Sequence, residues 1–335
     1  MRIGVLGAGS IGGMHAQLLG GLPDVSEVLV VDTDPARAAA AAENAGGRAV
    51  SHSEALDQAD ALVIATPAGL HADAVEAALG RGLPVLCEKP LTDDMASSAA
   101  LVQRVEAAGA HVEMGFQRRH DPGFVAARRQ VANGSTGRIH LLRLTAFDPR
   151  VVDRPPESWP AGEIAPLFLH SSVHDFDFVR WISGQEVLAL TVDGTRRDET
   201  RPADARGIET AVVSMSLSGG TLAMLEATWL HPSGYDIRAE LVAEHAHLSV
   251  GLSPRTPAQH LDWTDPHDAW TGYLERFEVA YRAELISFLA AVRGERRPAS
   301  AARDGLEALR IGVAATRSYA ERRPIEMAEI PYGAV

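Results

Sequence analysis

The sequence begins MRIGVLGAGSIGG, residues 1 to 13, and this stretch decides the fold. The apolar run RIGVLG predicts a short buried strand, and GAGSIG leads from it into a helix that starts at about Ile11. Within that pattern, Gly7 permits the tight turn. Gly9 lets a pyrophosphate approach the backbone, where the amides of the helix N-terminus receive it. This context predicts a dinucleotide-binding turn, and the alternative is a glycine-rich turn without a ligand.

Strands and helices continue to alternate through the first 118 residues. Further strands are expected at 27–32, 60–66, 84–90 and 111–116, and helices at 38–44, 71–82 and 93–109. Pro35 is well placed for the first turn of the earliest of these helices. Continuous apolar strands that alternate with helices predict a parallel sheet covered on both faces. We therefore expect a doubly wound Rossmann domain over residues 1–118, in an α/β chain.

The pattern changes after Arg119. One helix at 124–134 and one strand at 138–147 precede a Pro-rich loop at 148–166 and a helix over LFLHSSVHDFDFVRW, residues 167–181. Alternating strands follow at 186–194, 209–220, 221–230, 235–244 and 246–251, and helices at about 273–293 and 303–321 end the chain. The turns between these strands suit antiparallel neighbours. Residues 119–335 are thus expected to form an α+β domain with a large, mainly antiparallel open sheet.

Composition excludes several classes of protein. The net charge is −13, from 31 basic and 44 acidic residues, whereas a nucleic-acid-binding protein needs a basic patch. No apolar run approaches the roughly 20 residues that span a bilayer. The single cysteine, Cys87, permits no internal disulfide and favours a reducing compartment. We expect a cytoplasmic enzyme with neither nucleic acid nor membrane as a partner.

Two further positions suit redox chemistry on a hydroxyl group. Asp32 ends the second expected strand, 20 residues beyond Gly12, where a carboxylate accepts hydrogen bonds from ribose hydroxyls and repels a 2′-phosphate. This favours NAD, although Arg37 nearby leaves NADP possible. Lys89, in CEKP, follows the carboxyl end of an expected parallel strand, where open α/β sheets bind ligands. It can donate to a substrate hydroxyl, and the alternative is an ordinary surface lysine.

Four stretches carry a resemblance to a known family. They are ATPAGLHADAVEAALGRGLPVLCEKPL (65–91), GFQRRHDPGF (115–124), HDFDFVRWISG (174–184) and GYLERFEVAYRAELISFLAAV (272–292). Together they resemble the glucose–fructose oxidoreductase, inositol dehydrogenase and rhizopine-catabolism (Gfo/Idh/MocA) family, in its inositol 2-dehydrogenase-like branch. The resemblance implies NAD-dependent oxidation of a ring hydroxyl in a cyclic polyol or sugar, with myo-inositol first in line. It also implies a homo-oligomer, a tetramer or a dimer, that associates through the outer sheet face of the second domain.

The resemblance also implies roles for individual residues. The proton chemistry falls to Lys89 and His174, with His170 as orienting partner. The expected cofactor-binding residues are Gly7, Gly9, Ser10, Ile11, Gly12, Asp32, Arg37, Thr66, Pro67, His71, Glu88, Lys89 and Gln117. The expected substrate-binding residues are Lys89, Arg119, Asp148, His170, Ser171, His174, Tyr235 and Tyr281. A salt bridge is the alternative role for Arg119, and a place in the core is the alternative for the two tyrosines.

His170 stands where the family has an aspartate. On an α-helix, His170 and His174 lie on one face, with Cβ atoms about 5–6 Å apart. The carboxylate of the family stabilises the imidazolium that forms during catalysis, and an imidazole adds no such charge. Four interpretations stay open: a modified polyol site, a metal-binding pair that needs a third ligand such as His231 or Asp148, a catalytically altered NAD- or sugar-binding sensor, or a packing role. We expect no metal and favour the working enzyme.

Overall fold

The computed structural model describes residues 1–149, 164–196, 207–252 and 269–332. The chain forms two compact units. The first unit contains Met1–Gln117 and Tyr281–Leu306, and the second contains Arg118–Ala280 and Glu307–Tyr332. Within the described ranges, no helix combines the length and the apolar character that crossing a membrane requires.

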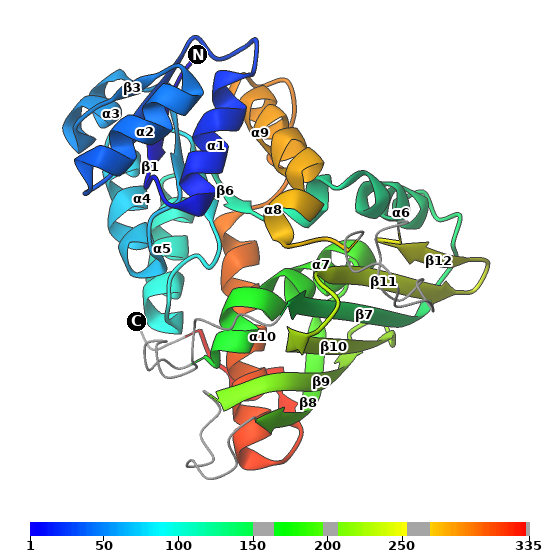
Figure 1. Cartoon of the computed structure of the whole chain (residues 1–335). Helices are drawn as coiled ribbons and strands as arrows, with labels where there is room; N and C mark the ends of the chain where they lie inside the picture. Colours follow the sequence, from blue (N-terminus) through cyan, green and yellow to red (C-terminus); the bar gives the residue numbers. More distant parts are fainter. Residues whose placement is uncertain (150–163, 197–206, 253–268, 333–335) are drawn as a thin grey trace. The chain divides into compact units, whose positions relative to one another are not determined.

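The first unit is built on a six-stranded parallel sheet (Figure 1). Its strands are β1 (Arg2–Leu6), β2 (Glu27–Val31), β3 (Arg48–Ala49), β4 (Ala61–Ile64), β5 (Val85–Glu88) and β6 (Val112–Gly115), in the order β3-β2-β1-β4-β5-β6. The order reverses at β1, which pairs with β2 on one side and with β4 on the other. The carboxyl ends of β1 and β4 therefore form the switch point at which doubly wound sheets bind ligands.

Helices from both ends of the chain complete the first unit. They are α1 (Ser10–Gly20), α2 (Pro35–Ala45), α3 (His52–Gln58), α4 (His71–Leu79), α5 (Met95–Ala107) and α9 (Glu278–Val292). Side chains of α9, among them Phe288 and Leu289, share one buried cluster with Ile3 and Val5 of β1 and with residues of α1 and α2. The helix near the end of the chain thus packs on the first sheet. The Rossmann fold is confirmed.

Local signals in the sequence set several helix starts. The Asp34 side chain accepts a hydrogen bond from the Ala36 amide (2.9 Å), with Pro35 in the first turn of α2. Asp121 caps α6 (Pro122–Ala132) in the same way, and here too proline opens the helix. Each cap satisfies amides that have no partner within the helix.

The second unit is built on a seven-stranded sheet. Its strands are β7 (Ile139–Pro149), β8 (Val187–Arg196), β9 (Ile208–Leu217), β10 (Leu222–His231), β11 (Asp236–Ala243), β12 (His247–Val250) and β13 (Ile325–Glu326), in the order β12-β11-β7-β10-β9-β8-β13. The β7–β10 pair is parallel and the other pairs are antiparallel. The expected mainly antiparallel sheet is confirmed.

Two expected helices of this part of the chain differ from the sequence-based prediction. The helix over 167–181 begins as a π-helix, Leu167–Ser172, and becomes α-helical only in α7 (Val173–Ser183). The helix over 273–293 is broken at Phe277, which separates α8 (Tyr273–Arg276) from α9. The Phe277 side chain is fully buried, with the Arg276 guanidinium 4.5 Å from its ring centre.

The remaining predictions for this part concern a loop and a helix. Of the expected Pro-rich loop, residues 150–163 lie outside the described residues, and β7 already includes Asp148 and Pro149. The last expected helix is α10 (Ala302–Glu321).

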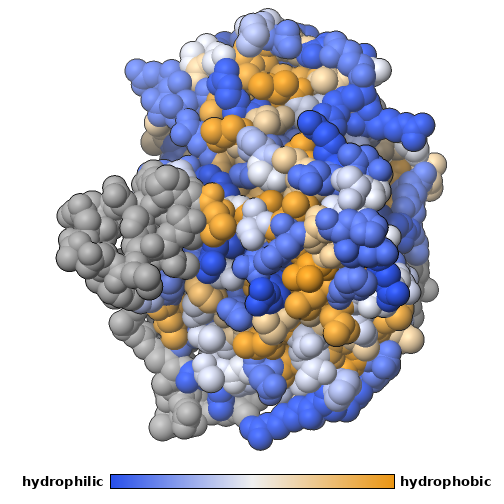
Figure 2. All heavy atoms as spheres, turned by 90° about the vertical axis from the view of Figure 1, so that its right-hand side faces the viewer, coloured by the Kyte–Doolittle hydropathy of each residue, from blue (hydrophilic) through white to orange (hydrophobic). Residues whose placement is uncertain are grey.

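Apolar side chains reach the surface among hydrophilic ones on the face that Figure 2 shows. The exposed large apolar residues over the whole described chain include Leu70, Leu188, Val212, Leu222, Leu252, Tyr273, Val279, Ile286 and Tyr332.

Candidate active site

The glycine turn after β1 has the geometry of a dinucleotide site. Gly7 has φ +92°, a left-handed conformation that favours glycine, and its amide donates to Val31 O at 2.8 Å. A Cβ on Gly12 would lie 1.9 Å from Gly7 O, so Gly12 allows the helix to pack against the turn. A Cβ on Gly9 would meet no atom within 4 Å. The backbone at Gly9 is therefore open to a pyrophosphate.

Helix α1 begins at this turn. Its first intrahelical hydrogen bond runs from Gly13 N to Gly9 O (2.8 Å). The amides that precede it, at Ser10, Ile11 and Gly12, have no intrahelical acceptor and point along the helix axis. Such amides, with the positive end of the helix dipole, bind anions. The turn and the helix start thus meet the two requirements that the sequence predicted for a pyrophosphate.

Asp32 is held rigidly beside the turn. Its Oδ2 accepts from Ala8 N (2.7 Å) and its Oδ1 from Asp34 N (2.8 Å). Arg37 Nη2 lies 3.1 Å from Oδ1. Burial raises the pKa of Asp32, but the two amide hydrogen bonds and the Arg37 charge together lower that pKa below its ordinary value. Asp32 is therefore a fixed anionic acceptor, as hydrogen bonding to ribose hydroxyls requires.

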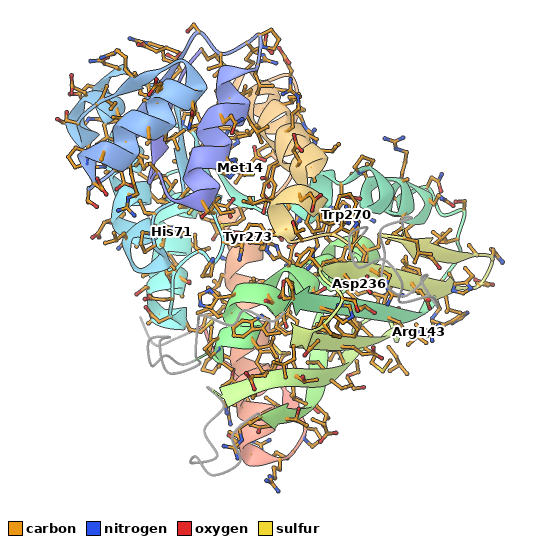
Figure 3. The ribbon with its side chains drawn as sticks, in the orientation of Figure 1. Met14, His71, Arg143, Asp236, Trp270 and Tyr273 are labelled. Carbon is orange, nitrogen blue, oxygen red and sulfur yellow. The ribbon has the colours of Figure 1, made fainter. Side chains whose placement is uncertain are left out.

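His71 connects the loop after β4 to the loop after β5. It is buried at the start of α4 and labelled in Figure 3. Its Nδ1 lies 2.8 Å from Pro90 O and its Nε2 2.7 Å from Thr66 O. Carbonyl oxygens only accept, so each contact is a hydrogen bond when the ring nitrogen that faces the carbonyl carries a proton. The structure thus uses His71 to hold the Thr66–Pro67 loop.

The Lys89 segment follows directly on β5. Glu88 Oε2 accepts from the Lys89 amide (3.2 Å), and Glu88 Oε1 lies 2.8 Å from His15 Nε2. Lys89 itself is half-buried, whereas Glu88 is buried. Burial, followed by the neighbouring Glu88 charge, raises the pKa of the Cys87 thiol, so Cys87 is unsuited to act as a nucleophile. The Glu88 side chain, which also contacts His15, thus holds the Lys89 amide through a hydrogen bond.

Two buried oxygens in the segments that follow β4 and β6 lack a hydrogen-bond partner among the described residues. They are Thr66 Oγ1, in the loop after β4, and Gln117 Oε1, in the short 3₁₀-helix Gln117–His120 after β6. Buried polar atoms in native proteins are normally paired. Both residues were expected to bind the cofactor, and both belong to the loops at the carboxyl end of the sheet.

In the second unit, the two histidines do not share one α-helix. His170 is half-buried in the π-helical turn, and His174 is buried in the first turn of α7. A π-helix bonds residue i to i+5, so the four-residue spacing does not give the α-helical geometry that we expected. Single π-turns inside helices are frequent at functional sites.

Two buried ion pairs hold α7 in place. Arg118 Nη1 lies 2.5 Å from Asp175 Oδ1. Arg119 makes a two-pronged contact with Asp177, at 2.5 Å (Nη2–Oδ1) and 2.9 Å (Nε–Oδ2). The structure thus gives Arg119 the salt bridge that was its alternative role. Asp175 and Asp177 were missed, although charges inside the apolar run HDFDFV are a signal for buried pairs.

Asp148 and Ser171, both expected to bind the substrate, are joined by a hydrogen bond. Ser171 Oγ donates to Asp148 Oδ2 (2.6 Å) and accepts from Trp229 Nε1 (2.6 Å). This chain adds Trp229, for which the sequence suggested no role, and it connects the end of β7 to the π-helical turn and to β10. The side chains next to His170 are therefore positioned by a continuous hydrogen-bonded chain.

The two expected pocket tyrosines occupy different units. Tyr235 is buried in the second unit, with its ring edge-on to Phe277 at 6.2 Å. Burial, followed by the Asp148 charge, raises its pKa, so its phenol stays neutral. Tyr281 is buried in the first unit, with its ring edge-on to His15 at 5.8 Å. Both side chains are thus parts of buried clusters.

One group of three possible metal ligands is found within the described ranges. It consists of His15, Glu88 and Glu284 and belongs wholly to the first unit. Neither His170 nor His174 is part of it. His231, a possible third ligand for the histidine pair, places its Nδ1 2.8 Å from Gly234 O.

Comparison with known proteins identifies the family. One model, described as "oxidoreductase family, NAD-binding Rossmann fold", matches residues 1–116, and its companion, "oxidoreductase family, C-terminal alpha/beta domain", matches residues 128–327. A myo-inositol dehydrogenase of Streptomyces leeuwenhoekii is 36% identical, over 95% of this chain and 97% of its own. An inositol 2-dehydrogenase of Rhizobium meliloti is 32% identical, over 98% and 99%.

Solved structures agree with this assignment. The crystal structure of a myo-inositol dehydrogenase from Corynebacterium glutamicum superposes with a TM-score of 0.84 and 28% sequence identity. The match covers 97% of this chain and 98% of that one. Both the order of the motifs and the fold of the two units therefore point to the same family.

Proposed function

The chain belongs to the Gfo/Idh/MocA oxidoreductase family, and from this premise we propose that it is an NAD-dependent dehydrogenase that oxidises a ring hydroxyl of a cyclic polyol to a ketone. A myo-inositol-like ring is the first substrate to consider. The observation that carries the proposal is the intact glycine turn with Asp32, in a chain that matches inositol dehydrogenases over nearly its full length. A related pyranose is the next substrate to consider.

The residues of the first unit fit NAD. The open backbone at Gly9 and the amides at Ser10–Gly12 suit the pyrophosphate, and the carboxylate of Asp32 suits the ribose hydroxyls. Arg37 forms an ion pair with Asp32, so it could bind the 2′-phosphate of NADP only after this ion pair is broken. Thr66 and Gln117 offer buried oxygens as further partners. When bound, the nicotinamide supplies the acceptor for a hydride.

We assign the proton chemistry to Lys89 and His174. Oxidation moves the hydrogen of the ring carbon, with its electron pair, to the nicotinamide, and the hydroxyl proton must leave as the C=O bond forms. His174 takes this proton as general base. Lys89 donates a hydrogen bond to the same oxygen. Both assignments rest on the resemblance, and the Glu88 contact to the Lys89 amide supports the second.

The second unit gives the remaining substrate contacts. Asp148 and Ser171 are joined by a hydrogen bond and lie beside the turn that carries His170. We propose that this pair and His170 bind ring hydroxyls. Arg119 and Tyr235 are buried with partners of their own, so in our proposal they position α7 and its surroundings and make no direct contact with the ring.

His170 in place of an aspartate adjusts the base. Without a carboxylate partner, the His174 imidazolium is less stabilised, so His174 should release its proton at a lower pH than in an enzyme with the aspartate. We propose that His170 orients His174 or the ring through a single hydrogen bond. A His170→Asp variant should raise the pKa of His174 and so shift the acid limb of the pH profile of kcat to higher pH.

We further propose a cytoplasmic homotetramer. Exposed apolar residues on neighbouring strands of the second sheet, Leu188, Val212 and Leu222, support association through this face. The one cysteine, which is free and buried, suits a reducing compartment. Analytical ultracentrifugation of the native protein and of Val212→Glu would test the assembly, because a charge on the interface should dissociate it.

The function is tested by the absorbance of reduced nicotinamide, with NAD and a panel of inositols and pyranoses. We expect one ring to be turned over well and NADP to be used poorly. Tight NAD binding without turnover of any ring would contradict the proposal and identify a sensor on the same fold. Asp32→Ala serves as control, because it should weaken NAD binding whichever ring is supplied.

A further inference from the structure

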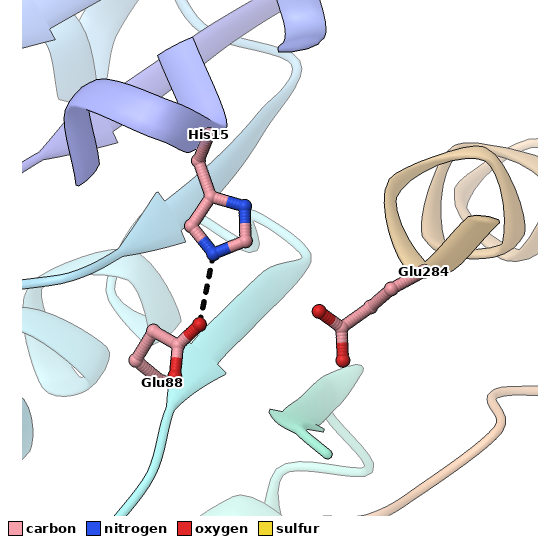
Figure 4. A group of neighbouring side chains, drawn as sticks. All are labelled: His15, Glu88 and Glu284. Atoms are coloured by element: carbon pink, nitrogen blue, oxygen red, sulfur yellow. Dashed lines mark hydrogen bonds and ion pairs between the residues drawn. The ribbon is translucent and has the colours of Figure 1, made fainter. Parts of the chain in front are cut away.

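Three buried side chains converge behind the backbone that carries Lys89. His15 comes from α1, Glu88 from β5 and Glu284 from α9, all within the first unit (Figure 4). One ligand atom from each lies within 4.8 Å of the other two. The Glu284 carboxyl group points toward the His15–Glu88 pair. No role in the proposed reaction has been given to His15 or Glu284.

The hydrogen bonding of this cluster is incomplete in one specific way. His15 Nε2 and Glu88 Oε1 are paired at 2.8 Å. His15 Nδ1 and both oxygens of Glu284 are buried and have no hydrogen-bond partner among the described residues. Glu284 is 1% exposed. An ionised carboxylate without hydrogen bonds at such a depth would be very costly, so something must neutralise it.

A metal ion and a proton are the two candidates. The donor types suit zinc, but two ligands of one tetrahedral zinc ion lie roughly 3.3 Å apart, given bonds of about 2.0–2.1 Å. His15 Nε2 and Glu88 Oε1, at 2.8 Å, are at hydrogen-bond distance instead. A metal would have to break this pair, whereas a proton on Glu284 requires no movement. The geometry therefore favours the proton.

The charges that face Glu284 act in the same direction. Glu88 faces it from β5 and Glu113 from β6, and both are acidic. Glu113 accepts in turn from Ala299 N (3.0 Å) and pairs with His111 Nε2 (2.8 Å). Burial, followed by Glu88 and Glu113, raises the pKa of Glu284 well above its ordinary value. The one basic side chain in the cluster, His15, is already paired with Glu88.

We propose that Glu284 is held as a neutral carboxylic acid that completes the His15–Glu88 pair, and that this cluster is a positioning site for Lys89. Glu88 provides the connection, because its Oε2 accepts from the Lys89 amide at 3.2 Å while its Oε1 contacts His15. Glu284 makes no direct hydrogen bond to the pair, so a proton on its carboxyl group lets it donate to the pair through one water molecule. The positioning step rests on the proposed function, whereas the protonation step does not.

Ionisation of Glu284 would place two carboxylates within 4.8 Å of each other in a buried site. Their repulsion would displace Glu88 and, with it, the Lys89 backbone. The native enzyme should therefore lose hydride transfer at alkaline pH, beyond any change in His174. Glu284→Gln keeps the shape and the neutral state, so it should retain the activity at neutral pH and remove this alkaline loss.

The first test measures stability against pH and needs no substrate. A group whose folded pKa is raised contributes stability below its unfolded pKa, and this stability is lost as pH rises through the folded pKa. Relative to Glu284→Gln, the unfolding equilibrium constant of the native chain should therefore rise by up to about tenfold per pH unit above about pH 5. The exposed Glu278→Gln on the same helix is the matched control and should leave the native slope unchanged.

Two further measurements make the proposal fail cleanly. An infrared band of a protonated carboxyl group should be present in the native protein and absent from Glu284→Gln. Zinc near one per chain that Glu284→Gln loses would overturn the proposal in favour of a metal site. Parallel stability curves for native and Glu284→Gln would overturn it too, even if the chain proves to be an inositol dehydrogenase. If the native protein and Glu284→Gln lose activity equally at alkaline pH, the positioning of Lys89 by Glu284 would be rejected, while the protonation of Glu284 would stand.

Discussion

The glycine turn of the first unit and helix α7 of the second unit are built in opposite ways. At the turn, the contacts lie within residues 7–37. Asp32 accepts hydrogen bonds from the backbone amides of Ala8 and Asp34, and Gly7 N donates to a backbone carbonyl, Val31 O. At α7, Arg118 and Asp175 are 57 positions apart, and the contact is a buried ion pair between side chains. One site is formed by local backbone geometry, and the other by long-range pairs of charges.

The difference predicts how each site fails. A backbone site tolerates changes of surrounding side chains but not an added Cβ at its glycines. A site fixed by buried charges tolerates neither partner alone, because the remaining charge is left unpaired in a low-dielectric environment. Substitutions at the turn should therefore be able to change ligand binding without changing stability, whereas substitutions at α7 should lower both together.

The largest effect is expected at the Arg119–Asp177 pair. Arg119→Met removes the guanidinium that pairs with the buried Asp177 carboxylate, and the free energy of unfolding should fall by about 3–5 kcal/mol. Adding Asp177→Leu to Arg119→Met should recover most of this loss. Urea denaturation of both variants is the measurement. If Arg119→Met unfolds like the native protein and only raises KM for the polyol, Arg119 is a substrate ligand and α7 is fixed by other contacts.

Gly12→Ala and Gly9→Ala should separate stability from binding at the turn. A Cβ at Gly12 would lie 1.9 Å from Gly7 O, so the free energy of unfolding of Gly12→Ala should fall by roughly 3 kcal/mol or more. Gly9→Ala meets no atom and should keep the stability, but calorimetry should show weaker NAD binding. Normal NAD affinity in Gly9→Ala would show that the pyrophosphate does not approach this backbone.

Ser171→Ala should have an intermediate effect on the second unit. It removes one partner each from Asp148 and Trp229, which should reduce the free energy of unfolding by about 1–2 kcal/mol. Ser135→Ala, at an exposed position, is the control for thermal and urea unfolding. Unchanged stability combined with a raised KM would mean that Ser171 acts on the ring alone.

The smallest effect is a pH dependence at the turn. The pKa of Asp32 is lowered in the folded chain, so its stabilising contribution is present above its ordinary pKa and is lost as pH falls through the lower folded value. Asp32→Asn should therefore flatten the acid side of the stability curve, whereas the exposed Asp57→Asn should not. Equal slopes in both variants would show that the amide hydrogen bonds do not favour the anion.

Local signals in the sequence predicted the fold well. Apolar runs and glycine turns gave the order of nearly all helices and strands, and Pro35 marked the first turn of a helix. The two-residue strands β3 and β13 show no periodicity, so no pattern predicts them. Helix α3 was also missed, although the capping-box pattern of Ser51 and Glu54 was present in the sequence.

The candidate sites were predictable to different degrees, for the same physical reason. Residues of the glycine turn act through backbone geometry, which a short motif specifies. The π-helical turn before α7 depends on tertiary packing and has no periodic signature that differs from an α-helix. The His15–Glu88–Glu284 cluster joins three elements that the chain brings together only in the fold, so no spacing in the sequence announces it.

The most direct test of the central claim follows deuterium from the substrate to the cofactor. The native protein and NAD are incubated with a cyclic polyol that carries deuterium on the carbon of the reacting hydroxyl. The mass of the reduced nicotinamide cofactor is then measured by mass spectrometry. Our account predicts one deuterium in each reduced nicotinamide and a slower rate than with the unlabelled ring. Reduced nicotinamide without deuterium, or none from any ring despite bound NAD, would contradict the assignment of this chain as a polyol dehydrogenase.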